Sequence, residues 1–424
     1  MNDSGIDFYG ITIGILAFFL VFPYVYYLLR KFGLDRKSIM YAVVLSAIGH
    51  FIGAVALYWF VITAGADSIF YFNNASIHYQ GLGYYFAFFV LGYAKAYLLG
   101  ESFLGAFLIS GALGFLASIY YLLTYKILLD KISGKYPLYE IDKKQLTYPA
   151  LLLLCWPSYF FWSAAIVKDN FAFLSIGMIL FVVARGKISI SSLIMLGIAF
   201  FLGFMIRPYL FIIFTFSTFI YLLLGSKWNI FFKITIISLL IASTYALLPL
   251  LGDYAMMMNF SSSTLGSMGE FAVRQQQYMN VGSSIPIPTH NPYLTFLFLP
   301  YLIFIDLFLP LGIGANNFIG IISSVENAYF LWWAVFFIRN KPLWKELKNN
   351  LRITRFFMIY SLFGMSCLSI MNSNLGLAMR EKMMYVPAML ICIFLTYAYK
   401  RMRLIHHYNQ QEEEQDCAQP NVVM

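Results

Sequence analysis

The sequence predicts an all-α polytopic integral membrane protein with about 11 transmembrane helices. Hydrophobic residues make up 61% of the 424 residues and charged residues only 11%, so the chain is far more apolar than a typical soluble domain. Most apolar runs approach the ~20 residues that a helix needs to cross a bilayer. The basic residues lie in short clusters between these runs, a pattern typical of membrane-protein loops. The net charge of +9 therefore does not indicate a nucleic-acid-binding face.

The apolar runs place the expected spans in order along the chain. The first is too long for a signal-peptide core and no small-residue cleavage site follows it, so we expect it to be retained. The expected spans are 9–29, 39–62, 103–125, 147–165, 170–184, 188–206, 209–225, 229–251, 317–338, 356–372 and 383–399.

The positive-inside rule then sets the orientation. With eleven spans, an outside N-terminus and a cytoplasmic C-terminus, 22 of the 28 Lys and Arg residues fall on cytoplasmic loops. These residues are Arg30, Lys31, Arg36, Lys37, Lys126, Lys131, Lys135, Lys143, Lys144, Arg185, Lys187, Lys227, Lys233, Arg339, Lys341, Lys345, Lys348, Arg352, Arg355, Lys400, Arg401 and Arg403. The chain is therefore expected to be a multi-pass membrane protein with its N-terminus outside and its C-terminus in the cytoplasm.

Two apolar stretches must not cross if this orientation holds. Segment 84–99 carries Lys95 and suits a helix in the outer interface, while 293–312 contains Pro300, Pro310 and Asp306 and suits a re-entrant or interfacial segment. If both crossed, everything between Lys126 and Lys233 would be inverted. We expect one transmembrane domain over 1–405 with outer loops 63–102 and 252–316. The tail 406–424 has no apolar period and is expected to be disordered.

Six cations remain on the outer side, against the charge rule: Lys95, Lys168, Arg207, Arg274, Arg380 and Lys382. A cation in such a place needs a partner, and a bound anion is one candidate. Arg207 lies between two apolar runs with almost no loop, so Asp169 or a phosphate would both serve as its partner. Lys168 and Asp169 end a tight hairpin, where an ion pair that only caps the turn is the simpler alternative.

The acids supply candidates for proton transfer. Asp67 follows the second span at its outer end, where it could act as a general base or simply end the helix. Glu326 falls inside the ninth span, and acids within the membrane are functional candidates by default. Arg380 and Lys382 lie in the last outer turn, which could also be a solvated group of charges, and Arg274 lies in the long outer loop.

Several chemistries have no support in the sequence. There is no P-loop, no Gly-rich dinucleotide motif and no Gly-x-Ser-x-Gly elbow, and the four cysteines share no metal-type spacing. The histidines are scattered, so no metal site is predicted. Carboxylates distant in the sequence leave a divalent cation as an open alternative.

The arrangement of these residues resembles known membrane enzymes of bacteria. It combines an outer Asp after an early span, a Pro-Ser-Tyr-Phe-Phe-Trp-Ser hairpin (157–163) that leads to Lys168-Asp169, an Arg207-Pro208 pair between spans, and the stretch 374–387 with Arg380. The stretch from 307–310 to Glu326-Asn327 adds to it. The pattern covers about half of the chain and is similar to polytopic glycosyltransferases of the GT-C type and to oligosaccharide-repeat polymerases of the Wzy class.

The resemblance implies a location in the inner (cytoplasmic) membrane of a bacterium. It also implies glycosyl transfer at the outer face of that membrane from a sugar linked to undecaprenyl phosphate or diphosphate, in the synthesis of O-antigen, capsule or exopolysaccharide. Its partners would be the lipid-linked donor, a saccharide acceptor, membrane lipid and other polysaccharide-assembly proteins. The family's acid maps to Asp67, although here it follows the second span rather than the first. Arg207, Arg380 and Lys168 would bind the phosphate, with Arg274, Lys382 and Glu326 as further substrate contacts, and Asp169 would be the second candidate base.

Two alternatives stay open. A flippase or transporter of lipid-linked oligosaccharide would also need cations for phosphate, but its charges should line a central path; an O-antigen ligase is a close chemical neighbour. For the enzyme, we expect Arg207→Ala and Arg380→Ala to abolish long-chain polysaccharide without changing the protein level.

Overall fold

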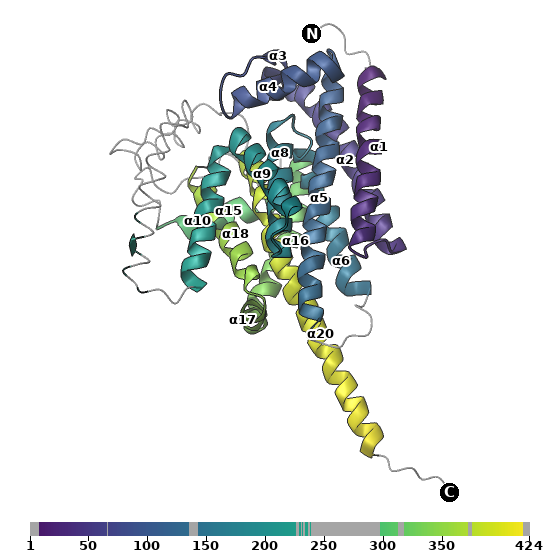
Figure 1. Cartoon of the computed structure of the whole chain (residues 1–424), viewed down its shortest axis with the longest axis vertical. Coiled ribbons are helices and arrows are strands. Elements are labelled where there is room, and N and C mark those ends of the chain that lie inside the picture. The colour runs from purple at the N-terminus through teal and green to yellow at the C-terminus, as the bar shows by residue number, and fades with distance from the viewer. Residues whose placement is uncertain are drawn as a thin grey trace.

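The computed structural model shows a bundle of helices (Figure 1). It describes residues 8–65, 67–134, 143–225, 297–312, 318–371 and 375–418, with a few isolated residues between 229 and 238. No strand occurs within these ranges. The chain is therefore helical wherever it is described, as its composition predicts. The expected span 229–251 and most of the outer loop 252–316, including Arg274, lie outside the described residues.

The helices of the first half are α1 (Phe8–Lys31), α2 (Lys37–Ala64), α3 (Asp67–Asn73), α4 (Tyr84–Ala94), the π-helix η1 (Lys95–Leu99), α5 (Phe103–Ser133), α6 (Lys143–Leu154), α7 (Pro157–Trp162), α8 (Lys168–Arg185), α9 (Ile190–Ile206) and α10 (Pro208–Gly225). Those of the second half are α15 (Leu299–Phe308), α16 (Phe318–Arg339), α17 (Lys341–Asn350), α18 (Ile353–Met371), α19 (Leu375–Glu381), the 3₁₀-helix η3 (Lys382–Met384) and α20 (Val386–Ala418).

Five of the described helices are long and apolar enough to cross a membrane: α1, α2, α5, α10 and α16. A sixth candidate is the pair Leu375–Met384 and Val386–Tyr408, which is bent by 59° at its junction. Other apolar helices, such as Ile190–Ile206 and Ile353–Ser369, are shorter. The protein is thus a helical membrane protein, and the count of eleven spans stays a prediction.

Helix α5 lies at the centre of the bundle. It is buried around its circumference and packs against α1, α2, α8 and α20. Its sequence explains this position, because apolar and small residues occupy every face and leave no polar stripe for water. The small residues let neighbouring backbones come close, as is common where membrane helices pack.

One end of the bundle gathers the basic loops. There the Lys131 ammonium group, near the end of α5, donates to the carbonyl oxygens of Ala184 (2.5 Å) and Arg185 (3.2 Å) at the end of α8. These carbonyls have no partner within their own helix, so a cation is favourable at this position. Figure 1 shows α17 and the C-terminal half of α20 at the same end, away from α3 and α4.

The opposite end carries the two short helices α3 and α4. Figure 1 shows them across the end of the bundle where α1 begins, rather than alongside the long helices. Segment 84–99, for which the charge rule predicts no crossing, forms α4 and η1 here. Lys95 is the first of the six cations that the charge rule leaves on the outer side. It pairs with Glu101 at 3.0 Å and lies over the Phe72 ring. Its position therefore needs no ligand.

Two expectations need correction at the level of elements. The expected span 147–165 is broken, because α6 ends at Leu154 and α7 begins at Pro157. The tail, expected to be disordered from residue 406, continues α20 as a helix to Ala418. A helix that is already nucleated extends readily through Gln and Glu residues, which are good helix formers. No proline interrupts the tail between residue 406 and Pro420.

Candidate functional site

A group of charged side chains, which we call the arginine cluster, joins four parts of the chain. Asp169 stands in the first turn of α8, and Arg207 ends α9. Tyr209 lies in the first turn of α10, and Arg380 and Glu381 end α19. The breaks between helices bring these residues together, since each polar side chain stands where an apolar helix starts or stops.

Asp169 is the centre of the arginine cluster. Its side chain is 0% exposed, and its two oxygens accept hydrogen bonds from Arg207 Nη2 and Arg380 Nε. Arg207 Nη1 also donates to Glu381 Oε1 at 2.9 Å and to the Tyr209 hydroxyl. Of the two partners that the sequence left open for Arg207, the structure shows the carboxylate. Removing one partner of such a buried pair costs roughly 3–5 kcal/mol, because a charge stays behind unpaired.

The cluster has an accessible side. The Asp67 side chain, at the start of α3, is 72% exposed, and its Oδ2 lies 4.0 Å from Arg380 Nη1. Lys168 Nζ lies 3.4 Å from the Tyr71 hydroxyl, also on α3. Burial, helped by the Asp67 carboxylate, raises the pKa of Tyr71 to about 12. Tyr71 is therefore a protonated hydroxyl at neutral pH and can donate to an anion.

The charges of the arginine cluster and the adjacent Lys168 do not cancel. Lys168, Arg207 and Arg380 face the two carboxylates of Asp169 and Glu381, which leaves one cation in excess before the exposed Asp67 is counted. Among the described residues, Lys168 has no carboxylate within ion-pair distance. This geometry offers an anion one uncompensated ammonium group, one protonated tyrosine hydroxyl and a free edge of Arg380.

Lys382 and Glu326 belong to a second group, which we call the Lys382 cluster. Lys382 Nζ donates to Asn327 Oδ1 (2.6 Å) and to the Leu307 carbonyl (3.0 Å). Glu326 accepts from the Ser158 backbone N–H at 2.6 Å and from the Ser158 hydroxyl. Both charged residues are buried, at 2% and 7% exposure. Their contacts tie α16 to η3 and to the start of α7.

The predicted site residues therefore divide. Asp67, Lys168, Asp169, Arg207 and Arg380 come together, Lys382 and Glu326 form the separate cluster, and Arg274 lies outside the described residues. The predicted role of Asp169 as second candidate base needs correction. Both of its carboxylate oxygens accept hydrogen bonds from guanidinium groups and no solvent reaches it, so it cannot serve as a general base. Its role is that of counter-ion to the two arginines.

Sequence analysis missed several contributors: Glu381, Tyr209, Tyr71, Ser158 and Asn327. Glu381 had a signal, because it stands between Arg380 and Lys382 and a membrane helix rarely carries three charges in a row without a purpose. The tyrosines had none, since 32 tyrosines are spread along the chain.

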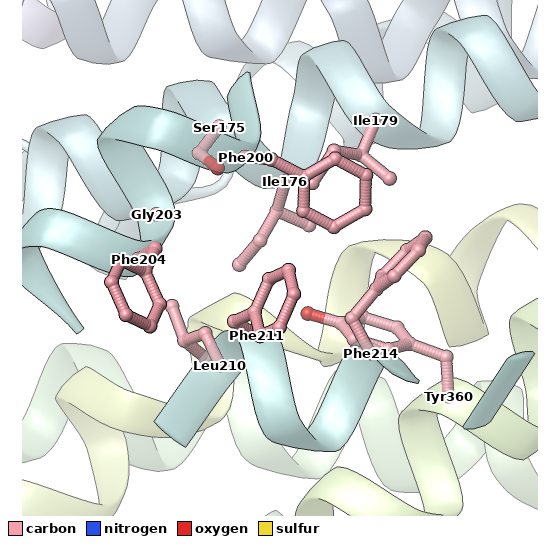
Figure 2. Close-up of a pocket in the computed structure, with 10 residues that line it drawn as sticks. All are labelled: Ser175, Ile176, Ile179, Phe200, Gly203, Phe204, Leu210, Phe211, Phe214 and Tyr360. Carbon is pink, nitrogen blue, oxygen red and sulfur yellow. The ribbon is translucent and has the colours of Figure 1, made fainter. Parts of the chain in front are cut away.

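A small cavity between α8, α9, α10 and α18 is not a substrate site. Figure 2 shows Phe204, Phe211 and Phe214 around it, together with Tyr360 and Ser175. Its volume is about 20 Å³, little more than one water molecule needs. The Ser175 hydroxyl donates to the Ala199 carbonyl at 2.5 Å. A sugar does not fit here.

Metal binding finds no support in the part of the chain that the structure describes, where no three His, Cys, Asp or Glu residues lie close enough to hold an ion. Comparison with known proteins gives no further guidance: no family model, no curated protein and no solved structure matches this chain.

Proposed function

We propose that this chain is a membrane glycosyltransferase or polysaccharide polymerase that transfers sugars from a polyprenyl phosphate or diphosphate carrier at the outer face of the membrane. The observation that carries the proposal is an exposed carboxylate, Asp67, at 4.0 Å from Arg380 of the arginine cluster, which together with Lys168 has one cation in excess before Asp67 is counted. Such a pair provides a base for the acceptor and a binding place for the donor's phosphate.

The proposed reaction divides the roles between these groups. The acceptor hydroxyl attacks the anomeric carbon of the donor sugar, and Asp67 takes its proton as the new glycosidic bond forms. The bond to the carrier breaks, and its electron pair leaves with the phosphate or diphosphate. Lys168 and the free edge of Arg380 stabilise the charge that grows on this leaving group. Asp169, which also pairs with Arg207, holds Arg380 in place from the buried side.

An apolar groove supports a lipid-linked donor. It has a volume of about 380 Å³ and lies between α2, α7 and α16, lined by Gly53, Phe161, Trp162 and Ile319 among others. Two of its walls, α2 and α16, are candidate membrane spans. Helix α7 forms the third wall, and a short turn joins it to Lys168. A hydrocarbon chain in this groove would enter the site from the membrane.

The experiment replaces Asp67 in a strain that lacks the chromosomal copy of the gene. We expect Asp67→Asn to lower long-chain surface polysaccharide about 10²–10⁴-fold in rate, the usual contribution of a general base. Protein level should not change, because the side chain is exposed and no buried contact is lost. Asp35→Asn is the matched control, since Asp35 is also exposed but precedes α2 at the basic end. Full activity of Asp67→Asn removes this residue from the role of base.

Lipid-linked intermediates in the deletion strain separate the candidate functions. Single repeats that accumulate indicate a polymerase, truncated repeats a transferase, and complete polymer that stays on its lipid carrier a ligase. Untranslocated repeats indicate a flippase, which is the second candidate. The Lys382 cluster favours that candidate, because Glu326 and Lys382 place buried charges inside the bundle rather than at its rim.

A further inference from the structure

A second pocket lies at the other end of the molecule, between the C-terminal end of α10 and the start of α18. It has a volume of about 260 Å³ and is lined by Tyr221, Leu222, Leu224, Gly225, Arg352, Arg355 and Ile359. The lining combines two arginines with apolar side chains. None of the described residues that line it is acidic.

The two arginines are positioned differently. Arg355 is held at the corner between α17 and α18, where its Nε donates to the Lys348 carbonyl (3.1 Å) and its Nη2 to Asn349 Oδ1 (2.7 Å). Its Nη1 has no partner within the described ranges. Arg352 is exposed, and its carbonyl accepts from the Arg355 backbone N–H at 3.0 Å. One guanidinium group held by hydrogen bonds and one exposed guanidinium group therefore border the same pocket.

The apolar part of the pocket belongs to the exposed surface of a candidate membrane span. Leu222 and Leu224 are 51% and 67% exposed on α10, which is apolar enough to span a membrane. The preceding helix α17 packs Trp344 and Leu347 into the protein core and exposes Lys341 and Lys345, so these two lysines point away from the bundle. An exposed apolar helix end beside exposed basic residues is the arrangement expected where the hydrocarbon layer meets the headgroups, on the side to which the basic loops belong.

We propose that this pocket binds the headgroup of an anionic glycerophospholipid from the adjacent leaflet. The lipid phosphate would accept hydrogen bonds from Arg352 and the free Nη1 of Arg355, since guanidinium groups suit phosphate oxygens. The upper part of an acyl chain would lie along Leu222 and Ile359. This site is separate from the arginine cluster and does not depend on the proposed transfer reaction.

The test measures lipid binding to the purified full-length protein by native mass spectrometry, with phosphatidylglycerol and phosphatidylcholine offered in the same detergent. We expect preferential retention of phosphatidylglycerol. Arg352→Gln should weaken it about fivefold, and Arg352→Gln with Arg355→Gln about 25-fold, from the usual contribution of one basic residue near an anionic surface. The single variant keeps the corner contacts of Arg355 intact.

Lys341→Gln with Lys345→Gln is the matched control, because it removes two charges from α17 without touching the pocket. It should leave phosphatidylglycerol binding within about twofold of the wild type. If this control loses as much phosphatidylglycerol binding as the arginine variants, general surface attraction explains the binding and the proposed site is wrong. If the arginine variants bind phosphatidylglycerol as the wild type does, the proposed site is also wrong. Inorganic phosphate is the last arm: if it displaces phosphatidylglycerol at equal concentration, the pocket is a site for free anions and not for lipid.

Discussion

Arg207 has two tasks that sequence alone could not separate. Its exposure is 2%, and it contacts Asp169, Glu381 and Tyr209, so its first task is to neutralise buried acids. Arg380 shares Asp169 but keeps one edge beside the exposed Asp67. The expectation that Arg207→Ala leaves the protein level unchanged therefore needs revision, because this variant removes one of the two arginines that pair with the buried Asp169 carboxylate.

We predict that Arg207→Ala lowers the free energy of unfolding by about 3 kcal/mol or more, the usual result of breaking a buried ion pair. Arg207→Lys keeps the charge but loses the two-pronged geometry of the guanidinium group. Its free energy of unfolding should therefore lie between those of Arg207→Ala and the wild type. Thermal unfolding in detergent measures both. Arg339→Ala, which removes an exposed arginine, is the control and should change the free energy by less than about 0.5 kcal/mol. An unfolding midpoint of Arg207→Ala equal to that of the wild type contradicts the pairing.

Helices α2 and α7 pass close to each other at Gly53. A Cβ atom added to Gly53 would lie 2.4 Å from the Phe160 carbonyl oxygen, too close for any real contact. That oxygen belongs to the backbone, so a side-chain rotation cannot relieve the clash. Helix α7 carries Ser158 at one end and leads to Lys168 at the other, and the spacing between α2 and α7 therefore bears on both clusters.

We predict that Gly53→Ala destabilises the protein by roughly 1–3 kcal/mol through overpacking. Gly197→Ala on α9 is the matched control, because no atom lies within 4 Å of its Cβ position. That change should be neutral or stabilising by up to about 1 kcal/mol, since alanine favours helix. Unfolding of both variants under the same conditions decides the point, and equal behaviour would show that α2 and α7 are not in close contact.

The junction of α19, η3 and α20 links the two clusters. Arg380 and Glu381 contact the arginine cluster, and Lys382 contacts Asn327 and Leu307. Residues two apart on a helix do not share a face, so Arg380 and Lys382 could not both serve one ligand. The same bent segment therefore supplies residues to both clusters.

At the scale of the whole molecule, the two ends of the bundle differ in their number of basic residues. The arginine cluster and α3 lie at the end with few basic loops, and α17 with its lysines lies at the other. If the positive-inside rule governs this chain, the first end faces outward and the second faces the cytoplasm.

We predict opposite labelling of two single cysteines in a variant whose four native cysteines are replaced by serine. Gln80→Cys, beyond α3, should react with a membrane-impermeant thiol reagent in intact cells. Lys345→Cys, on α17, should react only after the membrane is opened. Both side chains are exposed, so access to the reagent depends on the side of the membrane alone. Labelling of Lys345→Cys in intact cells overturns the orientation, and the proposed reaction at the outer face with it.

The sequence by itself determined the protein class, the two unlike ends and the cations that needed partners. These follow from composition and from the energy of placing charge in lipid, which depend on the order of residues and not on their three-dimensional contacts. Only the tertiary structure decided that Asp169 pairs with two arginines, that Glu381 joins them, and that Lys382 turns away to Asn327. These contacts join residues up to 211 positions apart in the sequence. Which of these residues meet in space depends on how the helices pack and where they break.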